Sequence, residues 1–413
     1  MEGCVALRDA AACERAGRLD QAARHFRRAY RLWPELDSAM HSDGVPAALR
    51  READALARPL DEEEEWRLAR ACWPALQGLG LADGELAAVS SRCLQRLWTG
   101  LGYVVRLSLS GTEGSECSAI AKVVRLPDEA EDWHRRDLDS YGVEAAFYER
   151  GLAQRLQLTG AACPTGLHVE RGDGGRLTIC MTEAPGTHAR RLSRAQALAA
   201  LSWLARLHAS CWGPAAAAAA VAAGLHAQGC YWRLGRPGDD PGGREAPEPA
   251  GLRSRLRLAS PGLDARLRAD HLHTVCHGDA KGANMLFDEG GGVAFVDFQW
   301  ACQASAAKDL AYCLTCGYPE DLEDGEEEYL GHYHRELAAL LRADAVRPGL
   351  QQVRDSYQLA CCDLARFQCT AGWWGNAQAL RARAAAVLDR VDGGSPLPSE
   401  EAYRDAIFGA FPV

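Results

Sequence analysis

The most informative stretch of the chain is Val275-Cys-His-Gly-Asp-Ala-Lys-Gly-Ala-Asn-Met-Leu-Phe-Asp288, followed by Val293-Ala-Phe-Val-Asp-Phe-Gln299. It fits the pattern His-x-Asp-x-x-x-x-Asn, an apolar strand, and a second strand that ends in Asp-Phe. An isolated Asp-Phe or His-Gly-Asp sequence is common and usually marks only a turn. The complete spaced set, with apolar residues on both sides, is much rarer and predicts a strand–loop–strand site for phosphoryl transfer.

Three side chains in this stretch are suited to that chemistry. Asp279 can orient an acceptor hydroxyl group and accept its proton. Asn284 lies five residues on and can reach a magnesium ion from the same loop. Asp297, thirteen residues after Asn284 on the next strand, can hold metal ions that bridge nucleotide phosphates. Two carboxylates and an amide are hard oxygen ligands, a set that favours Mg²⁺ over soft metals.

The motif resembles the protein-kinase-like fold of small-molecule kinases, which include aminoglycoside phosphotransferases, choline kinases and especially the ecdysteroid-kinase-like (CHK kinase-like) family. The last family shares the His-Gly-Asp of 277–279 and the Asp-Phe-Gln of 297–299. The resemblance covers roughly residues 85–395. It implies an α+β, bilobal fold with a small β-rich N-lobe and a helical C-lobe. It also implies ATP and Mg²⁺ as cofactors and a small-molecule hydroxyl as acceptor.

The resemblance gives roles to five residues of the central motif. By it, Asp279 is the catalytic base, and Asn284 and Asp297 are ligands of Mg²⁺. His277 would brace the loop rather than react. Lys281, two residues after the catalytic aspartate, would contact the phosphate during its transfer.

Lysine is rare in this chain, because of 46 basic residues only Lys122, Lys281 and Lys308 are lysine. In the fold that the motif resembles, an ATP-anchoring lysine lies on the strand after a glycine-rich turn, and Lys122 lies on such a predicted strand. A compact ammonium group fits between phosphates where a forked guanidinium group is bulkier. The carboxylate partner of Lys122 would be Glu144, in a Glu-x-x-x-Tyr sequence similar to that of the family, or Glu149 on the same helix.

The resemblance places further nucleotide contacts in a Gly-x-Gly turn before a strand and in a hinge between the lobes. The residues are Gly100, Gly102, Met181 and Glu183. A Gly-x-Gly turn lets backbone N–H groups approach a phosphate. The glycine turn at 111–114 is a rival position that ranks lower. The hinge, at 180–186, would meet adenine through its backbone.

Two neighbouring residues follow the central motif. In the family an aspartate at the position of Asp309 starts a helix and ties down the catalytic loop, so we expect Asp309 to support the loop structurally. Lys308 is expected to be only its neighbour on the surface. The cysteines at 313 and 316 lack a second pair at zinc spacing, which favours core packing over metal binding.

Local sequence patterns divide the chain into three parts. They are an all-helical extension at 1–84 with one tetratricopeptide-like unit at 13–34, an N-lobe with hinge at 85–186, and a helical C-lobe at 187–413 with a low-complexity insert at 213–250. The predicted strands are 102–109, 119–126, 177–182, 273–276 and 293–298, and the predicted helices are 141–157, 194–212 and most of the chain from about 308.

Composition excludes several classes of protein. The net charge is −10 and the arginines are scattered, which argues against a nucleic-acid-binding protein. No apolar run reaches the length needed to cross a bilayer. Acidic residues among the first twenty argue against a signal or transit peptide. The 16 cysteines lack the spacing of a disulfide framework, so we expect buried free thiols and a cytoplasmic location.

The acceptor is less well defined than the reaction. The acidic run at 320–328 is expected to be a solvated loop, with attraction of a cationic acceptor as the alternative. Trp373 and Trp374 offer aromatic faces that suit either an ammonium group or an apolar ring system, although packing in a helical core is the more frequent use of such residues.

The sequence therefore predicts an ATP-dependent phosphotransferase that transfers the γ-phosphate to a hydroxyl group of a small molecule. One alternative is a catalytically silent kinase-like binding module, with the N-terminal helices as a surface for a protein partner. Another is a protein kinase, but no Ala-Pro-Glu sequence follows Asp297 and the room for a peptide-docking loop is missing.

Overall fold

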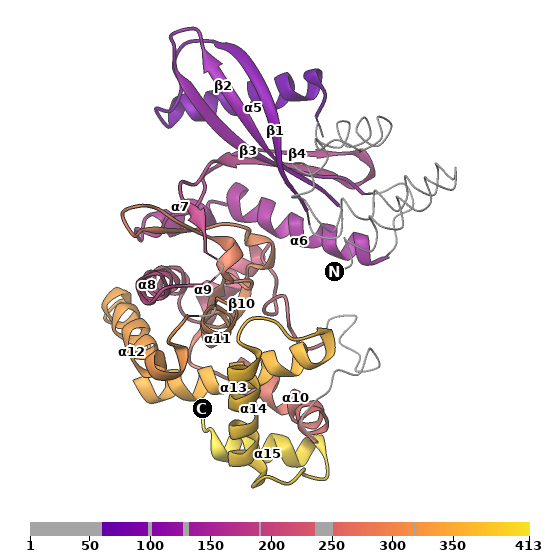
Figure 1. Ribbon diagram of the computed structural model, residues 1–413, viewed down its shortest axis with the longest axis vertical. Helices are drawn as coiled ribbons and strands as arrows, with labels where there is room; N and C mark the ends of the chain where they lie inside the picture. The colour runs from indigo at the N-terminus through magenta and orange to yellow at the C-terminus, as the bar shows by residue number, and fades with distance from the viewer. Residues whose placement is uncertain (1–59, 98–100, 127–131, 190, 236–250, 318) are drawn as a thin grey trace, which may run out of the picture. The chain divides into compact units, whose positions relative to one another are not determined.

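The computed structural model describes residues 60–97, 101–126, 132–189, 191–235, 251–317 and 319–413. These residues form two compact units, drawn in Figure 1. The first unit contains the described residues up to Tyr141 together with Thr165–Glu183, and the second contains Gly142–Pro164 and Ala184–Val413. The tetratricopeptide-like unit predicted at 13–34 lies outside the described residues, as does most of the predicted helical extension.

The first unit is a five-stranded antiparallel sheet with the order β1-β2-β3-β5-β4 and a helix packed on it. Its elements are α5 (Glu62–Gly78), β1 (Leu86–Arg96), β2 (Gly102–Gly111), β3 (Glu116–Val124), β4 (Gly166–Gly172) and β5 (Arg176–Thr182). Because side chains alternate along a strand, one face of β2 and β3 is apolar and packs against α5. The buried residues that these two strands contribute to this core are Val105, Leu107, Leu109, Ala119, Ala121 and Val123.

Helix α5 begins where the sequence places its acidic run. Asp61 accepts a hydrogen bond from the Glu64 backbone N–H, and the Glu64 side chain accepts one from the Asp61 N–H, which together form a capping box. The glutamates at 62–65 fill the first turn, where negative charge interacts favourably with the positive end of the helix dipole.

The helix predicted at 141–157 is two helices. The first, α6 (Asp132–Glu149), runs across the boundary between the units, and α7 (Leu152–Gln157) follows it. Gly151 separates them with a φ of +75°, a left-handed conformation that breaks the helical path. The break lies beyond Glu144, so both candidate partners of Lys122 remain on α6.

The second unit is mainly helical and carries two small sheets (Figure 1). Its further helices are α8 (Arg194–Ser210), α9 (Pro214–Ala222), α10 (Leu252–Arg268), α11 (Ala307–Cys316), α12 (Leu322–Leu340), α13 (Leu350–Ala371), α14 (Ala377–Asp392) and α15 (Glu400–Ala410). Its strands are β6 (Thr187–His188), β7 (His273–Cys276), β8 (Met285–Phe287), β9 (Val293–Phe295) and β10 (Cys302–Ser305). The α+β class, with a β-rich unit and a helical unit, is confirmed.

Two expectations about the second unit are wrong. The acidic run at 320–328 forms the start of helix α12 rather than a loop. Lys308 is buried rather than exposed, because helix α11 turns it into the interior. Within the low-complexity insert, residues 214–222 form helix α9, whereas 236–250 lie outside the described residues. None of the helices in the described ranges is both long enough and apolar enough to cross a membrane.

Candidate active site

The His-Gly-Asp loop follows β7 in a conformation that requires glycine at its centre. Gly278 has a φ of +80°, and a Cβ atom there would lie 2.0 Å from the backbone oxygen of Trp300. The loop therefore passes directly against the segment after Asp297, which only the absence of a side chain allows.

Gly278→Ala should unfold more easily than the wild type by roughly 1–3 kcal/mol, and should also displace Asp279. Gly291→Ala is the matched control, because Gly291 has nearly the same φ, +83°, with nothing within 4 Å of the position that the added methyl group would take. Urea unfolding of both variants separates the cost of the clash from the cost of the backbone conformation. Equal losses in the two variants would mean that the contact with Trp300 imposes no constraint.

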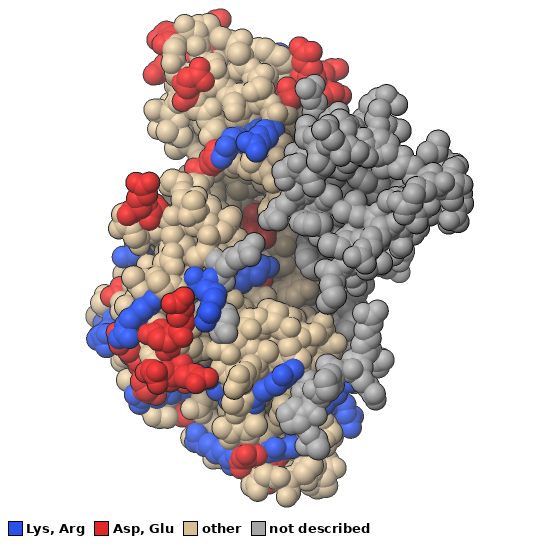
Figure 2. All heavy atoms as spheres, in the orientation of Figure 1, with Lys and Arg blue, Asp and Glu red and all other residues tan. Residues whose placement is uncertain are grey.

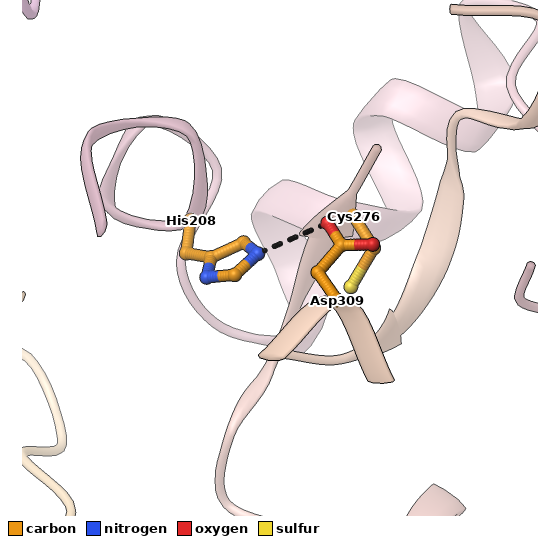
Figure 3. A group of neighbouring side chains, drawn as sticks. All are labelled: His208, Cys276 and Asp309. Atoms are coloured by element: carbon orange, nitrogen blue, oxygen red, sulfur yellow. Dashed lines mark hydrogen bonds and ion pairs between the residues drawn. The ribbon is translucent and has the colours of Figure 1, made fainter. Parts of the chain in front are cut away.

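Asp309 anchors the loop from the first turn of α11, as the resemblance implies. Its Oδ2 accepts a hydrogen bond of 2.6 Å from the His277 N–H, and its Oδ1 accepts one of 2.9 Å from the Gly278 N–H. The His208 ring lies 3.3 Å from Oδ2 on the other side (Figure 3). Asp309 is buried, so these charge-assisted hydrogen bonds are shielded from water and fix the loop strongly.

His208, Cys276 and Asp309 lie close enough to form a metal site, but their atoms are already used (Figure 3). His208 Nδ1 lies 2.8 Å from the Tyr333 hydroxyl group, and the Cys276 thiol donates to the Ser305 carbonyl. Burial raises the pKa of the Cys276 thiol well above its ordinary value, whereas a metal ligand must be a thiolate. We therefore interpret the group as a structural brace.

The two carboxylate oxygens of Asp279 have different surroundings. Oδ2 accepts hydrogen bonds from Lys281 Nζ at 2.7 Å and from Asn284 Nδ2 at 2.9 Å. Oδ1 is buried and receives no hydrogen bond of good geometry from the described residues, although the buried Tyr312 hydroxyl group interacts with the carboxylate. Burial raises the pKa of Asp279, an effect that the positive charge of Lys281 only partly offsets. A buried oxygen without a well-placed donor is costly, so this atom is suited to receive a ligand hydroxyl.

Asn284 and Asp297 meet because two short strands run antiparallel. Asn284 immediately precedes β8 and Asp297 follows shortly after β9, so both residues lie at the same end of the pair. The Val296 N–H donates to the Asn284 carbonyl at 3.0 Å and closes that end. The Asn284 amide nitrogen donates to Asp279, so the amide oxygen is the atom that the predicted metal contact would use.

Asp297 itself has a strained backbone. Its φ of +70° is left-handed, and within the described ranges only one other non-glycine residue, Cys230, shares a positive φ. Such conformations cost about 1–3 kcal/mol and concentrate at functional sites. An amide oxygen and a carboxylate at one strand end fit the donor set that Mg²⁺ prefers.

His277 braces the loop, as expected. Its Nε2 lies 3.1 Å from the Val296 carbonyl oxygen, and its Nδ1 accepts a hydrogen bond from the Asp279 N–H. The ring is buried against Phe295 and Phe298. These contacts leave the imidazole no exposed nitrogen for chemistry.

The residues predicted to bind the nucleotide from the first unit lie on its central strands. Lys122 is buried on β3 opposite Val104 of β2, and its ammonium lies 5.2 Å from the centre of the Tyr141 ring. Because its neighbours Ala121 and Val123 pack toward α5, Lys122 projects from the other face of the sheet.

The other residues predicted to contact the nucleotide have different surroundings. Gly102 begins β2, and a Cβ atom there would lie 1.9 Å from the Val123 carbonyl oxygen, so close strand packing requires glycine here whether or not a phosphate binds nearby. Gly100 lies outside the described residues. Met181 is buried on β5. The Glu183 carboxylate is engaged by Arg106 and accepts a hydrogen bond of 2.7 Å from Ser118. A contact of the Glu183 backbone with adenine stays a prediction.

Glu144 is a better candidate than Glu149 for the predicted carboxylate partner of Lys122. Glu144 is buried and its Oε1 accepts a hydrogen bond of 3.3 Å from the Phe298 N–H, next to Asp297. Glu149 is exposed near the end of the helix. A buried carboxylate tied to the Asp-Phe sequence is the better partner for a buried lysine. The pairing of Glu144 with Lys122 stays a prediction.

Lys308 belongs to an ion-pair network that the sequence did not reveal. Its Nζ lies 2.9 Å from Asp363 Oδ2, and Arg366 Nε donates to Asp363 Oδ1 at 2.8 Å. Asp363 and Arg366 both come from α13, more than fifty residues along the chain. The Lys308 ammonium also lies 4.6 Å from the centre of the Trp232 ring. The only sequence signal was a lysine retained in an arginine-rich chain.

Four of the seven acids in the run at 320–328 form ion pairs with arginines, which weakens the attraction of the run for a cationic acceptor. Its ion-pair partners are Arg194, with Asp321 and Glu328; Arg354, with Glu327; and Arg383, with Glu326. On the face drawn in Figure 2, acidic and basic side chains are likewise interspersed over the second unit. Paired acids attract a polycation weakly, because their field is largely cancelled.

A family model matches the part of the chain that contains this site. The ecdysteroid kinase-like family model matches residues 260–344, which contain the His-Gly-Asp loop, Asn284 and Asp297. The resemblance inferred from the motif is confirmed over that range. Among curated protein sequences, none matches this chain.

Solved structures with a similar course of the chain are small-molecule kinases by their titles. An amicoumacin kinase in complex with AMP-PNP, Ca²⁺ and its antibiotic is 14% identical, with 82% of this chain and 95% of that chain covered and a TM-score of 0.41. A microcompartment-associated aminopropanol kinase is 14% identical, with 81% and 98% covered and a TM-score of 0.46. An aminoglycoside-3'-phosphotransferase of type VIII is 20% identical, with 70% and 97% covered and a TM-score of 0.35. Similarity at this level does not assign an activity.

Proposed function

We propose that the protein is an ATP- and Mg²⁺-dependent phosphotransferase that acts on a hydroxyl group of a small molecule. The observation that carries the proposal is the state of Asp279. One of its oxygens is fixed by Lys281 and Asn284, and the other is buried without a hydrogen bond of good geometry. A hydroxyl group of an acceptor supplies the missing donor and is then aligned for attack on a phosphorus atom.

Asp279 and Lys281 have complementary roles in this reaction. Asp279 orients the hydroxyl group and takes its proton as the oxygen–phosphorus bond forms. Lys281 opposes the rise in the pKa of Asp279 that burial causes, and it balances negative charge on the transferred phosphoryl group. The pair supports this assignment because burial lowers the pKa of Lys281 but the Asp279 charge more than restores it, so the amine stays protonated.

The amide oxygen of Asn284 and the carboxylate of Asp297 would hold Mg²⁺. When bound, the ion neutralises phosphate oxygens and keeps the transferred group in line with the acceptor. The chain's own contribution is to bring the two oxygen donors to one end of the β8–β9 pair. The strained backbone at Asp297 supports a functional use of this position.

The nucleotide would be held mainly by the first unit. In this proposal Lys122 contacts the phosphates and pairs with Glu144, Gly100 and Gly102 bring backbone N–H groups near them, and the Met181 and Glu183 backbone meets adenine. The burial of Lys122 on the face of the sheet away from α5 supports the assignment.

Two measurements test the proposal. The midpoint of thermal unfolding should rise with ATP only when Mg²⁺ is present. ADP release should then be measured over a library of small alcohols, with product mass recorded to confirm a gain of one phosphoryl group. Binding without turnover on any alcohol would favour the silent binding module. Phosphate transfer to peptides but not to small alcohols would favour the protein kinase.

Lys122→Arg should lower kcat/KM for ATP by about 100-fold, which corresponds to about 2.7 kcal/mol. The forked guanidinium group is bulkier than an ammonium group and cannot replace it at a buried strand position between phosphates. Arg125→Lys is the matched control, since Arg125 lies one residue beyond β3 and pairs with Glu64 on α5. Near-normal ATP kinetics in Lys122→Arg would mean that the nucleotide lies elsewhere.

A further inference from the structure

The described part of the low-complexity insert contains a segment that follows the catalytic loop closely. This segment, residues 226–233, comes after helix α9. The His226 backbone pairs with the start of β10 and accepts a hydrogen bond of 3.0 Å from the Gln303 N–H. Further along, the Tyr231 N–H donates to the Gly278 carbonyl at 3.2 Å. This hydrogen bond fixes the Tyr231 backbone against Gly278, the residue immediately before Asp279.

Two partly exposed aromatic rings flank the loop at this point. Trp300 adjoins Gly278, as its backbone oxygen would contact any side chain placed there. The Tyr231 ring lies edge-on to the Trp300 ring, with centroids 5.3 Å apart, and edge-on to the Phe367 ring at 5.5 Å. Phe367 is buried, and the His226 ring stacks on the Trp300 ring with centroids 5.5 Å apart, so Tyr231 and Trp300 belong to a packed aromatic surface near Asp279.

The position of Tyr231 is reinforced by the network around Lys308. The next residue, Trp232, is fully buried, and its carbonyl oxygen accepts a hydrogen bond of 2.7 Å from Arg366. The Lys308 ammonium covers the Trp232 ring. These contacts fix the backbone of the segment at Trp232, so the position of Tyr231 relative to the His-Gly-Asp loop is fixed as well.

The charges beside Tyr231 are paired. The Lys281 ammonium lies near Tyr231 and 2.7 Å from Asp279 Oδ2, so it neutralises the carboxylate that would otherwise attract a cation. A cationic group of an acceptor placed against Tyr231 would therefore gain little, whereas an uncharged ring or other apolar face would cover the aromatic surface.

We propose that Tyr231 and Trp300 bind an uncharged apolar or ring face of the acceptor next to its reacting hydroxyl group, and that Tyr231 sets the preference for such acceptors. This inference rests on the proposed function for the identity of the reaction. The surface itself is defined by contacts within the second unit, so its binding is measurable without turnover.

Fluorine NMR of protein labelled with 5-fluorotryptophan tests binding directly, and Trp300→Phe assigns the Trp300 resonance. Titration with 2-phenylethanol should shift that resonance, whereas ethanol at the same concentration should not. Tyr231→Ala should weaken the apparent affinity for 2-phenylethanol by about tenfold, the upper range for one aromatic contact, and Tyr231→Phe should preserve it. A Trp300 resonance that ignores 2-phenylethanol would overturn the inference.

Trp212→Ala is the matched control, because Trp212 is another partly exposed aromatic residue of the second unit and its indole donates to the Val346 carbonyl far from Asp279 in the sequence. It should leave the affinity unchanged. With Mg²⁺ and ATP, Tyr231→Ala should raise KM for 2-phenylethanol more than KM for ATP. Phosphorylation that is independent of Tyr231 would refute this inference and leave the proposed function standing, whereas binding without phosphorylation would do the reverse.

Discussion

Replacing Asp279 by asparagine should lower ATP-dependent phosphorylation of an acceptor by about 1,000-fold. The substitution keeps the size of the side chain but removes the ability to accept a proton. Oδ1 is the buried oxygen without a hydrogen bond of good geometry, so it is the atom that would receive the acceptor hydroxyl. The loss should appear in kcat, measured as labelled phosphate transferred to the acceptor in single-turnover reactions.

A matched control for this variant is Asp288→Asn. Asp288 lies nine residues further on, is exposed, and caps a turn through the Gly292 N–H. It should retain wild-type turnover. Circular dichroism of both variants would establish that each is folded. Asp279→Asn with full phosphate transfer would contradict the assignment of Asp279 as the base, and the carboxylate would then be a structural partner of Lys281 alone.

The local sequence pattern was sufficient to predict the strands that carry the candidate site residues. Strand β7 has the bounds that alternation and the apolar run predict, and β2, β3 and β5 agree to within a few residues. The roles of His277 and Asp309 in bracing the loop followed from the resemblance to the family, and both act through contacts within or near the loop. Short-range geometry is encoded locally, because few conformations satisfy a loop so tightly fixed.

Elements with weak local signals were missed. Strand β1 has two register shifts against β2, which disturb the alternation of apolar residues that marks a strand. Helix α10 contains Pro261, a residue that normally ends a helix, and it was not predicted. Tertiary packing stabilises both elements and overrides the local preference, because α10 buries one apolar side and β1 packs the partly buried Leu86 and Val89 against the core.

The composition of the chain marked Lys308 as unusual, but it did not give the residue a partner. Asp363 and Arg366 are three residues apart on one turn of α13, a spacing that is ordinary for surface ion pairs. Only the packing of α11 against α13 makes this cluster buried. The residue regarded as an exposed neighbour is therefore part of the interior of the second unit.

Asp363→Ala should destabilise the second unit by about 3–5 kcal/mol, because it leaves the buried Lys308 charge without its carboxylate. Burial raises the pKa of Asp363, but Lys308 and Arg366 outweigh it and lower the net value, so the carboxylate is ionised at neutral pH. Its contribution is therefore present above the ordinary aspartate pKa of about 4 and is lost as the pH falls through the lower folded-state pKa. Urea unfolding at pH 7 and at pH 3 should show a smaller difference from wild type at the lower pH.

Two further variants identify the cause of that loss. Asp355→Ala, at a partly exposed position of α13 where the carboxylate pairs with Arg390, should cost less than about 1 kcal/mol. The double variant Lys308→Met with Asp363→Leu removes the unpaired charge and should recover part of the lost stability. If Asp363→Ala unfolds within about 1 kcal/mol of wild type, then water or another group must already solvate Lys308. The fixed position of Trp232 and of Tyr231 beside the catalytic loop would then need a different support.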